Sequence, residues 1–566
     1  MRIFLNGNAY EIQGGVTRTP LSEWADNIRF DGQQQRKDRR YISSWSFDDW
    51  SDGLGIKRWR ADDSTRQKGL WDVENCDTRD LTQIRLSTLF NTCTMNPSRG
   101  DLDLLFTYID QLYFLESNSP LPTGGNLPVV YQFSPPVTLG SYRDLFTLSG
   151  VAQGALKAVT VIGQNIITFG IQSNNVNTLA YVATIGVAGV RIGTINTHSG
   201  GVRPELANMV GTLHCITYDN TKQKAYFYLV DEIFGTPTLA KTINTAVGTY
   251  LSPMVTDGIK MYAQLPKGIY NFDATPAIEI DTSNSEELNG QMALFRNNLL
   301  FKNGYSLIKY DGTDLTPIGY DLKDGLPSDK MGKITAMAST WKECFAAVQG
   351  ATFSHILTWN DKAWQYYAII PTAGLWVKQL FLSNQPDIID RVWVIYGNYA
   401  IPGYYLNPII SPQLAATYAH TSFGYFTLPE FDGGIPEAKS GFYNLVVDYE
   451  AESGTALAGF HGVNGSVPTA QLFSESGEPW AVSVETLGSP YGIEGNKIQF
   501  QFQMLNIAYG ITPKFHSSVL QYLKIPNIRE QYDFTIDINK TANSLKGVKP
   551  LEAVIGSLNY ERGLRT

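Results

Sequence analysis

Ser306–Ile318, SLIKYDGTDLTPI, is a strand of alternating apolar residues, a turn built on Asp311-Gly312, and a second strand. The same pattern returns as GIYNFDATPAIEI at Gly268–Ile280 and as SHILTWNDKAWQYYAII at Ser354–Ile370. The copies follow one another at intervals of roughly 40 to 50 residues, which is the spacing of four-stranded propeller blades. This repeat therefore predicts a β-propeller.

Hairpin patterns continue on both sides of these copies. KAVTVIGQNIITFGIQ at Lys157–Gln172 and HCITYDNTKQKAYFYLV at His214–Val230 each read as two strands around a polar turn. Two further patterns, at Asp103–Glu116 and Arg391–Leu406, mark the ends of the repeat region. The units number six or seven, so residues 101–412 are predicted to form a six- or seven-bladed propeller.

A different strand pattern follows the propeller region. In NKIQFQFQMLNIA at Asn496–Ala508, apolar residues alternate with glutamines, which is typical of a strand with one buried face. Several such strands within residues 440–540 predict an antiparallel β-sandwich. Prolines punctuate the stretch 413–439, which reads as a linker, and residues 541–566 alternate little and read as a C-terminal arm. The predicted fold class is all-β.

Residues 1–100 are rich in Trp, Arg and Asp and lack a clear period. Such a mixture makes a poor core by itself, whereas Trp and Arg dominate protein interfaces. Two interpretations are open: an extended arm that docks onto neighbouring subunits, or a segment that packs beneath the propeller of its own chain. The candidate assembly contacts are Trp24, Trp45, Trp50, Trp59 and Trp71.

The composition argues against some classes of function. Charged residues make up 17% of the 566 residues and the net charge is −9, so a nucleic-acid interface is not expected. The one short basic run, Gln35–Arg40, reads as a surface loop. The four cysteines are far apart and have no metal-binding spacing, so we expect free thiols in a reducing compartment.

The N-terminal sequence carries no export signal that we can identify. MRIFLNGNAYEI has neither a basic n-region nor an apolar h-region. No run of about 18 apolar residues occurs, so no membrane span is expected. We therefore expect the chain to be made inside a cell and not to be exported by a signal of its own.

Catalytic motifs are missing from the sequence. Asp273, Asp311, Asp314 and Asp361 occupy comparable places in successive units, and a glycosidase would need two such carboxylates to converge. Asp is also a common turn residue, which is the simpler interpretation. The six histidines are scattered singly, and GxSxG, Walker A and GxGxxG sequences are absent. We predict no catalytic residue, no metal site and no cofactor.

Aromatic residues offer candidate glycan contacts, because exposed rings on β-scaffolds stack on sugars. Trp359, Trp364, Tyr366 and Tyr367 gather around one turn of the propeller region, and Trp480 lies in the predicted sandwich. The alternative interpretation is that these rings pack in the core and between blades.

Three features together resemble a class of tailed-bacteriophage virion proteins. The first is the passage WSFDDWSDGLGIKRW, at Trp45–Trp59, followed later by DTRDLTQIRL. The second is the propeller with short turns such as Lys309-Tyr310-Asp311-Gly312. The third is the sandwich segment GNKIQFQFQML at Gly495–Leu505, followed by Ile511-Thr512-Pro513 and a closing strand. In such proteins the propeller and sandwich are surface modules of a tail, baseplate or fibre.

The resemblance implies a non-enzymatic structural component of a phage virion, in the tail or host-adsorption apparatus. It would be made in the host cytoplasm and would act by assembly and surface recognition, in many symmetric copies. Its expected partners are other virion proteins and a host surface glycan. Two alternatives remain: a head-decoration or neck protein, and a propeller-type carbohydrate-active enzyme that acts on host polysaccharide.

Overall fold

The structure is a computed structural model, and all the secondary structure that it describes is β-strand. The chain is therefore all-β, as predicted. The structure describes residues 2–5, 8–20, 43–58, 68–89, 91–92, 102–108, 111–120, 126–133, 142–147, 156–162, 165–171, 177–182, 190–195, 205–219, 224–230, 237–244, 254–265, 268–272, 276–278, 292–303, 306–320, 324–370, 372–385, 388–397, 402–408, 419–433, 439–488, 492–507, 510–525 and 530–536.

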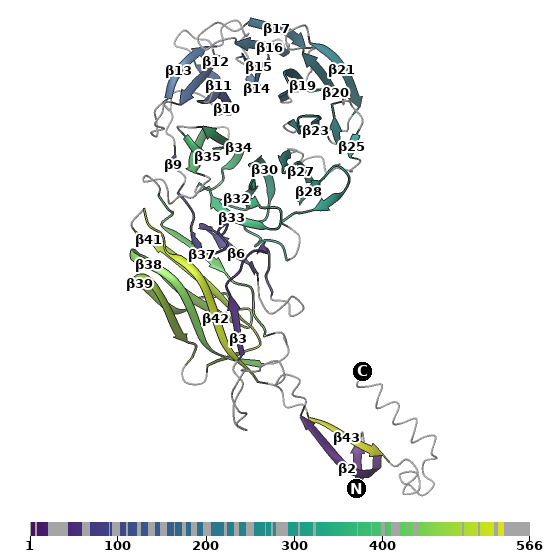
Figure 1. The fold of residues 1–566 in the computed structure, drawn as a ribbon, viewed down its shortest axis with the longest axis vertical. Coiled ribbons are helices and arrows are strands. Elements are labelled where there is room, and N and C mark those ends of the chain that lie inside the picture. Colours follow the sequence, from purple (N-terminus) through teal and green to yellow (C-terminus); the bar gives the residue numbers. More distant parts are fainter. Residues whose placement is uncertain are drawn as a thin grey trace.

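Seven four-stranded antiparallel sheets form a ring around a central opening (Figure 1). The first strands of neighbouring blades contact each other at six of the seams, including the one between the first and last blades, where β10 (Leu102–Tyr108) meets β34 (Trp376–Gln385). The third and fourth blades share a hydrophobic core. The described strands thus form a seven-bladed propeller, within the predicted range of six or seven blades.

The first three blades are β10–β13, β14–β17 and β18–β21. Their remaining strands are β11 (Gln111–Pro120), β12 (Asn126–Phe133), β13 (Tyr142–Thr147), β14 (Leu156–Ile162), β15 (Asn165–Ile171), β16 (Asn177–Val182), β17 (Val190–Ile195), β18 (Glu205–Met209), β19 (Thr212–Asp219), β20 (Lys224–Val230) and β21 (Thr238–Asn244). The hairpins predicted at Lys157–Gln172 and His214–Val230 are confirmed as β14–β15 and β19–β20.

The next three blades hold the repeats that first indicated the fold. They are built from β22 (Val255–Thr256), β23 (Met261–Leu265), β24 (Gly268–Asn271), β25 (Pro276–Ile278), β26 (Met292–Phe295), β27 (Asn298–Asn303), β28 (Ser306–Tyr310), β29 (Leu315–Pro317), β30 (Lys333–Ser339), β31 (Cys344–Gln349), β32 (Ser354–Trp359) and β33 (Trp364–Ile369). Each repeat supplies the two outer strands of its blade: β24–β25, β28–β29 and β32–β33.

The seventh blade is closed by a strand from earlier in the chain. It consists of β34, β35 (Ile388–Gly397), β36 (Pro402–Pro408) and β9 (Asn91–Thr92). β9 precedes the first blade in sequence, so the propeller begins before the predicted boundary at residue 101. Between the inner strands of the seventh and first blades, the side-chain amide of Gln379 on β34 accepts from the backbone N–H of Leu105 on β10 at 3.0 Å and donates to the Leu105 carbonyl at 3.4 Å.

Similar side-chain contacts join other neighbouring blades. The side-chain amide of Asn208 donates to the Val161 carbonyl at 3.2 Å, and that of Gln264 donates to the Lys302 carbonyl at 2.8 Å. The Ser339 hydroxyl donates to the Leu294 carbonyl. Each contact ties a side chain of one blade to the backbone of its neighbour.

A ten-stranded sheet forms the second unit, which lies beside the ring (Figure 1). Its strands come from both ends of the chain. They are β3 (Ser43–Phe47), β6 (Asp72–Glu74), β7 (Cys76–Asp77), β8 (Ile84–Leu86), β37 (Phe423–Thr427), β38 (Lys439–Val463), β39 (Ala470–Thr486), β40 (Ile493–Gly495), β41 (Ile498–Asn506) and β42 (Lys514–Ile525).

The long strand β38 takes part in both layers of this unit. Its first half pairs with β42 and its second half pairs with β41, with register shifts between the two halves. Phe515 on β42 packs 4.8 Å from Phe502 on β41 and 4.9 Å from Phe426 on β37, measured between ring centroids. Since neither β41 nor β37 pairs with β42, these rings meet face to face across a core, and the predicted β-sandwich is present.

The predicted domain boundaries need correction around this sandwich. Residues 43–89 do not form a separate arm, because β3, β6, β7 and β8 are strands of the sandwich sheet. β37, within the predicted linker, is also one of its strands. Local sequence could not show this, since β3, β6 and β8 are strands of three to five residues whose partners, β42 and β37, lie hundreds of positions away.

Two small sheets complete the described structure. β1 (Arg2–Leu5), β2 (Asn8–Pro20) and β43 (Glu530–Ile536) pair in a three-stranded sheet at the far end of the sandwich from the ring (Figure 1). β43 was predicted within the sandwich and instead pairs with the N-terminal strand β2. β4 (Gly53–Leu54) and β5 (Gly69–Leu70) form a short parallel pair. The predicted C-terminal arm, 541–566, lies outside the described residues.

Candidate functional site: a rigid junction and an exposed aromatic face

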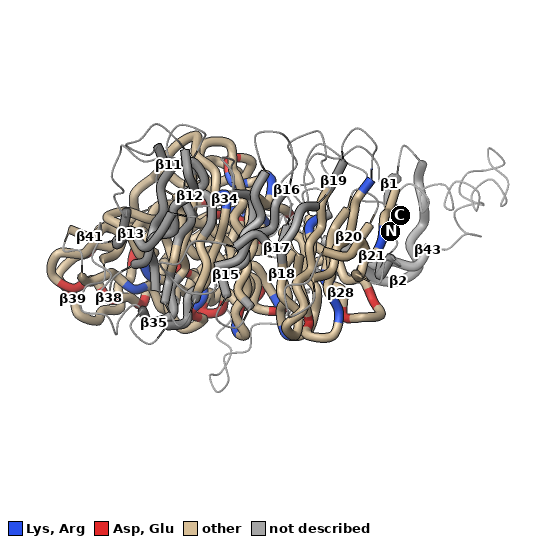
Figure 2. The backbone as a smooth tube through the Cα atoms, turned by 90° about the horizontal axis from the view of Figure 1, so that it is seen from above, with Lys and Arg blue, Asp and Glu red and all other residues tan. Residues whose placement is uncertain are grey.

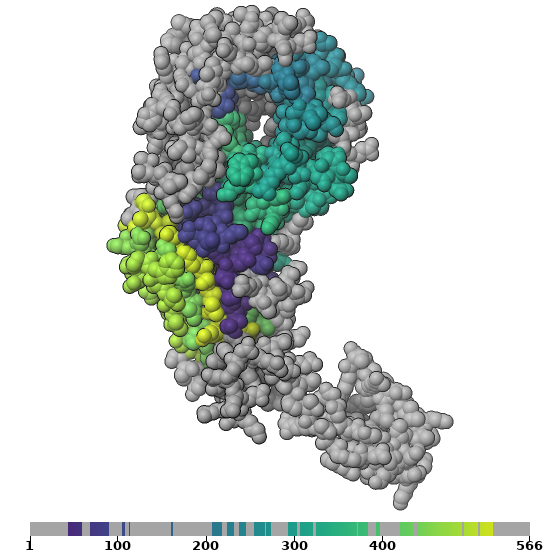
Figure 3. Space-filling view, viewed as in Figure 1, coloured from purple at the N-terminus to yellow at the C-terminus, as the bar shows by residue number. Residues whose placement is uncertain are grey.

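The N-terminal segment fills the junction between ring and sandwich, where Figure 3 shows it in purple between the two. Trp45 and Trp50 are buried there in one hydrophobic core, which extends from the sandwich into the fifth and sixth blades. Trp71 is half-buried, with the Lys57 Nζ 5.4 Å from its ring centroid. These three tryptophans therefore pack within their own chain, which was one of the two interpretations of this segment. Trp24 and Trp59 lie outside the described residues.

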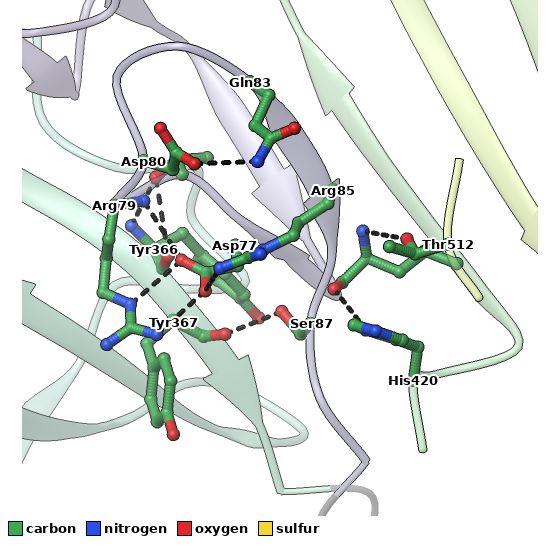
Figure 4. A network of polar contacts seen from close by, with 12 residues as sticks. Asp77, Arg79, Asp80, Gln83, Arg85, Ser87, Tyr366, Tyr367, His420 and Thr512 are labelled. Atoms are coloured by element: carbon green, nitrogen blue, oxygen red, sulfur yellow. Dashed lines mark hydrogen bonds and ion pairs between the residues drawn. The ribbon is translucent and has the colours of Figure 1, made fainter. Parts of the chain in front are cut away.

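A charged network crosses this junction (Figure 4). Arg79 donates to Asp77 at 2.8 Å and to Glu343 of the sixth blade at 3.0 Å, and its guanidinium carbon lies 4.2 Å from the Tyr367 ring centroid. Burial alone would raise the pKa of Asp77, but the charge and hydrogen bonds of Arg79 outweigh burial and hold that pKa below its ordinary value. Breaking a buried pair of this kind leaves a charge without compensation.

Neutral hydrogen bonds continue the same contact along the outermost strand of the sixth blade. The Thr78 backbone N–H donates to the Tyr366 carbonyl at 3.1 Å, and the Thr78 hydroxyl oxygen accepts from the Tyr366 N–H at 2.9 Å. The Gln365 side chain donates to the Trp50 carbonyl at 3.2 Å, and the Ser87 hydroxyl donates to the Tyr367 carbonyl at 2.6 Å. The segment therefore covers β33, which would otherwise be an open sheet edge.

A second cluster at the junction surrounds Lys330. Its Nζ lies 2.5 Å from the Asp72 carboxylate and 3.5 Å from that of Glu74, both on β6 of the sandwich. Burial alone would lower the pKa of Lys330, but the Asp72 charge outweighs burial and raises that pKa, so this buried amine stays protonated. The Arg79–Glu343 pair, the cluster around Lys330 and a shared hydrophobic core thus hold the ring and the sandwich together as one body.

The aromatic group predicted as a glycan contact on the propeller belongs to this junction. Trp359, Trp364, Tyr366 and Tyr367 are all buried, with at most 7% of any of them exposed. Trp364 donates its indole N–H to the Ile318 carbonyl, and the Tyr366 hydroxyl pairs with His355 at 3.0 Å. The prediction of glycan contact is wrong for these four residues, because the N-terminal segment and neighbouring blades cover them.

Trp480 is exposed, in contrast to that group. It lies on β39 with 62% of its surface exposed, and Val482 and Val484 extend the row at 60% and 61%. Its ring stacks on His516 of β42, with centroids 4.9 Å apart and planes 9° from parallel. This row forms part of the outer face of the sandwich, since the alternate residue Ala481 packs against the core.

Two register shifts along β38 bring the rings of Trp480 and His516 together. Beside Glu450 of β38, the register shifts both toward β39, between Tyr449 and Ala451, and toward β42, between Asp448 and Tyr449. Bulges re-aim side chains, and here residues from two strands that flank β38 meet over it. Glu450 lies among them, accepting from Lys514 Nζ at 2.5 Å and pairing with His516 Nε2 at 3.0 Å. Burial would raise the pKa of Glu450, but these bonds outweigh burial and lower it.

Three of the four carboxylates considered for glycoside hydrolysis are described, and they lie in turns between the third and fourth strands of their blades. Asp311 and Asp314 sit between β28 and β29, where Asp311 accepts from the backbone N–H groups of Thr313 at 2.9 Å and Asp314 at 2.7 Å. These bonds lower the pKa of Asp311, as in an Asx-turn. Asp361 pairs with Lys309 at 2.6 Å, and Asp273 lies outside the described residues. Asp311, Asp314 and Asp361 are therefore turn residues, which was the simpler of the two interpretations.

Charges and metal ligands give no further site in the described part of the chain. In the view of Figure 2, the Lys and Arg residues of the described part are distributed over several strands. Among the residues that the structure describes, no group of three or more His, Cys, Asp or Glu side chains could hold a metal ion. The described residues also include no helix that is long and apolar enough to cross a membrane.

Similarity to known proteins is low. No family model matches the sequence, and no curated protein matches it. The β-propeller domain of the Trilobed protease from Pyrococcus furiosus is similar, with 9% identity and a TM-score of 0.36 over 56% of this chain and 97% of that one. An exo-β-1,3-galactanase from Phanerochaete chrysosporium has 9% identity and a TM-score of 0.29 over 78% and 100%.

A third similar structure is the extracellular domain of a putative hybrid two-component system from B. thetaiotaomicron. It has 10% identity and a TM-score of 0.38 over 70% of this chain and 47% of that one. Enzymes are thus among the similar structures, but likeness at this level concerns the arrangement of strands and indicates no activity for this chain.

Proposed function

We propose that this chain is a non-enzymatic structural component of a tailed-phage virion, in the tail or host-adsorption apparatus. The observation that carries the proposal is the combination of a rigid two-module body and an exposed aromatic face. The Arg79–Glu343 and Lys330–Asp72 pairs fix the sandwich on the ring, so the Trp480 face is held in one orientation relative to the propeller. A rigid platform that presents one surface suits surface recognition within a larger assembly.

The sequence resemblance to virion proteins supports the same proposal. Other virion proteins would be its assembly partners, and several symmetric copies would multiply weak contacts into avidity. Hydrolysis by the propeller is the less favoured alternative, because Asp311, Asp314 and Asp361 are occupied in turns and ion pairs away from the inner strands.

Immunogold electron microscopy tests the proposal directly. Antibodies raised against the purified chain would be applied to particles of the phage that encodes it. Label at the tail or its tip is expected. Label on the capsid or neck would favour the decoration alternative, and particles without label would overturn a virion role. Release of reducing sugar from host polysaccharide by the purified chain would overturn the non-enzymatic reading.

A further inference from the structure

We propose that the outer face of the sandwich binds an uncharged sugar ring of a glycan, stacked on the free face of Trp480. This inference deepens the surface recognition proposed above and rests on it. The site, called here the Trp480 platform, comprises Trp480 and His516 with Glu450 and Lys514 at its rim.

The indole of Trp480 is held in place before any ligand arrives. One of its faces is covered by His516, at 4.9 Å and 9°, and 62% of the residue is exposed. A ring fixed in this way loses little conformational freedom on binding. The π-face of an indole is electron-rich and attracts partial positive charge, which the C–H groups on one face of a pyranose ring supply.

Polar groups at the rim match the hydroxyls of a sugar. The two ring nitrogens of His516 lie 3.0 Å from the Glu450 carboxylate and 3.4 Å from the Thr82 carbonyl oxygen, two acceptors of which a neutral imidazole can serve one as donor. Lys514 uses one of its three N–H donors on Glu450, so the other donors of this partly exposed amine can reach a hydroxyl oxygen. An apolar plate with a few fixed polar groups at its edge is the usual composition of a small-ligand site.

The charge around the platform selects against acidic ligands. Glu450 and Asp448 lie at alternate positions of the same strand, and the exposed Glu478 lies two residues before Trp480, whereas Lys514 and His516 both pair with the one carboxylate of Glu450. An acidic sugar would meet net repulsion at this face. Val482 and Val484 continue the apolar row along β39, which gives room for further units of a neutral chain.

Isothermal titration calorimetry with defined hexasaccharides tests this inference. The probes are cellohexaose, maltohexaose and chitohexaose as neutral ligands and hexagalacturonate as the acidic one. The full chain should bind at least one neutral probe and should bind hexagalacturonate at least ten-fold more weakly. Trp480→Ala should weaken neutral binding at least ten-fold, and His516→Ala several-fold, because the indole loses its support.

Trp341→Ala is the matched control, since Trp341 is 82% exposed in the turn between β30 and β31 of the ring. Trp341→Ala should bind the neutral hexasaccharides as tightly as the unsubstituted protein does. Binding of no neutral probe, preference for hexagalacturonate, or undiminished binding by Trp480→Ala would each overturn the inference. Those outcomes leave tail labelling by antibody unaffected, whereas unlabelled particles would overturn the proposed virion role and leave sugar binding by the purified chain intact.

Discussion

Arg79 and Glu343 form a buried ion pair, with the Arg79 Nη1 3.0 Å from Glu343 Oε1, although 264 positions separate them in sequence. Arg79 lies in the N-terminal segment, and Glu343 lies immediately before β31 in the sixth blade. The segment that precedes the ring in sequence therefore connects the ring to the sandwich. Its side chains are 12% and 5% exposed.

Arg79→Ala should destabilise the protein by about 3–5 kcal/mol, because the buried Glu343 would lose its ion pair and Asp77 would keep only the longer contact with Arg85, at 3.8 Å. Arg296→Ala is the matched control. Its side chain is 45% exposed and its nearest carboxylate oxygen on Asp361 is 3.7 Å away, so the expected cost is about 0–1 kcal/mol. Denaturant unfolding measures both; equal losses would contradict a special role for the buried pair.

Stability should fall in acid through Asp77. The folded-state pKa of Asp77 lies below its ordinary value, so its contribution is present above the unfolded-state pKa, about 3.9. That contribution is lost as the pH drops through the folded-state pKa, because the unfolded chain binds the proton more readily. Asp77→Asn should be less stable at pH 7 and should lose less stability between pH 5 and pH 3. An unchanged pH slope in the variant would argue against this assignment.

Trp50→Ala should cost about 3–5 kcal/mol, because Trp50 is fully buried in the shared core and its indole N–H donates to the Asp80 carbonyl at 2.9 Å. Trp341→Ala changes the same residue type at an exposed turn and should stay within about 0.5 kcal/mol of the parent. Thermal unfolding of the two variants compares them. If Trp50 served only to dock onto a neighbouring subunit, both variants would unfold at the same temperature.

Gly53 should tolerate no side chain. It has a φ of +68°, and a Cβ at this position would lie 2.1 Å from the Trp364 carbonyl oxygen of the sixth blade. Gly53→Ala should therefore separate the segment from β33 and cost more than about 3 kcal/mol. Gly258→Ala has a similar φ of +89° with no atom within 4 Å of the new Cβ, so it should show only backbone strain, about 1–2 kcal/mol. Equal costs would rule out the close approach.

The sequence was most informative where contacts are local. The repeat at Ser306–Ile318 predicted β28 and β29, because an alternating pattern and an Asx-turn are properties of neighbouring residues. The passage Asp77-Thr78-Arg79 stands in the sequence as three polar residues, but nothing in it names Glu343 or Tyr366 as a partner. Long-range pairing depends on which edges remain open once the blades have formed.

The candidate site was predicted only in part for the same reason. Trp480 could be selected as an aromatic residue in an alternating strand, but His516, Glu450 and Lys514 were missed as its neighbours. His516 is a polar residue in the predicted strand FHSSVLQYLKI. The strand pattern predicts only that such a residue faces solvent, and it does not predict which side chains lie beside it. Two bulges beside Glu450 bring it to Trp480, and bulges leave no distinct signal in a single sequence.

Competition for adsorption tests the account most directly. Host cells would be incubated with the purified chain, with its Trp480→Ala variant or with Trp341→Ala, and the rate of attachment of the encoding phage would then be measured. We expect the parent chain and Trp341→Ala to slow attachment in proportion to their concentration and Trp480→Ala to have at least ten-fold less effect. Attachment at the same rate with all three proteins, at concentrations that saturate any binding to cells, would contradict a role in host adsorption.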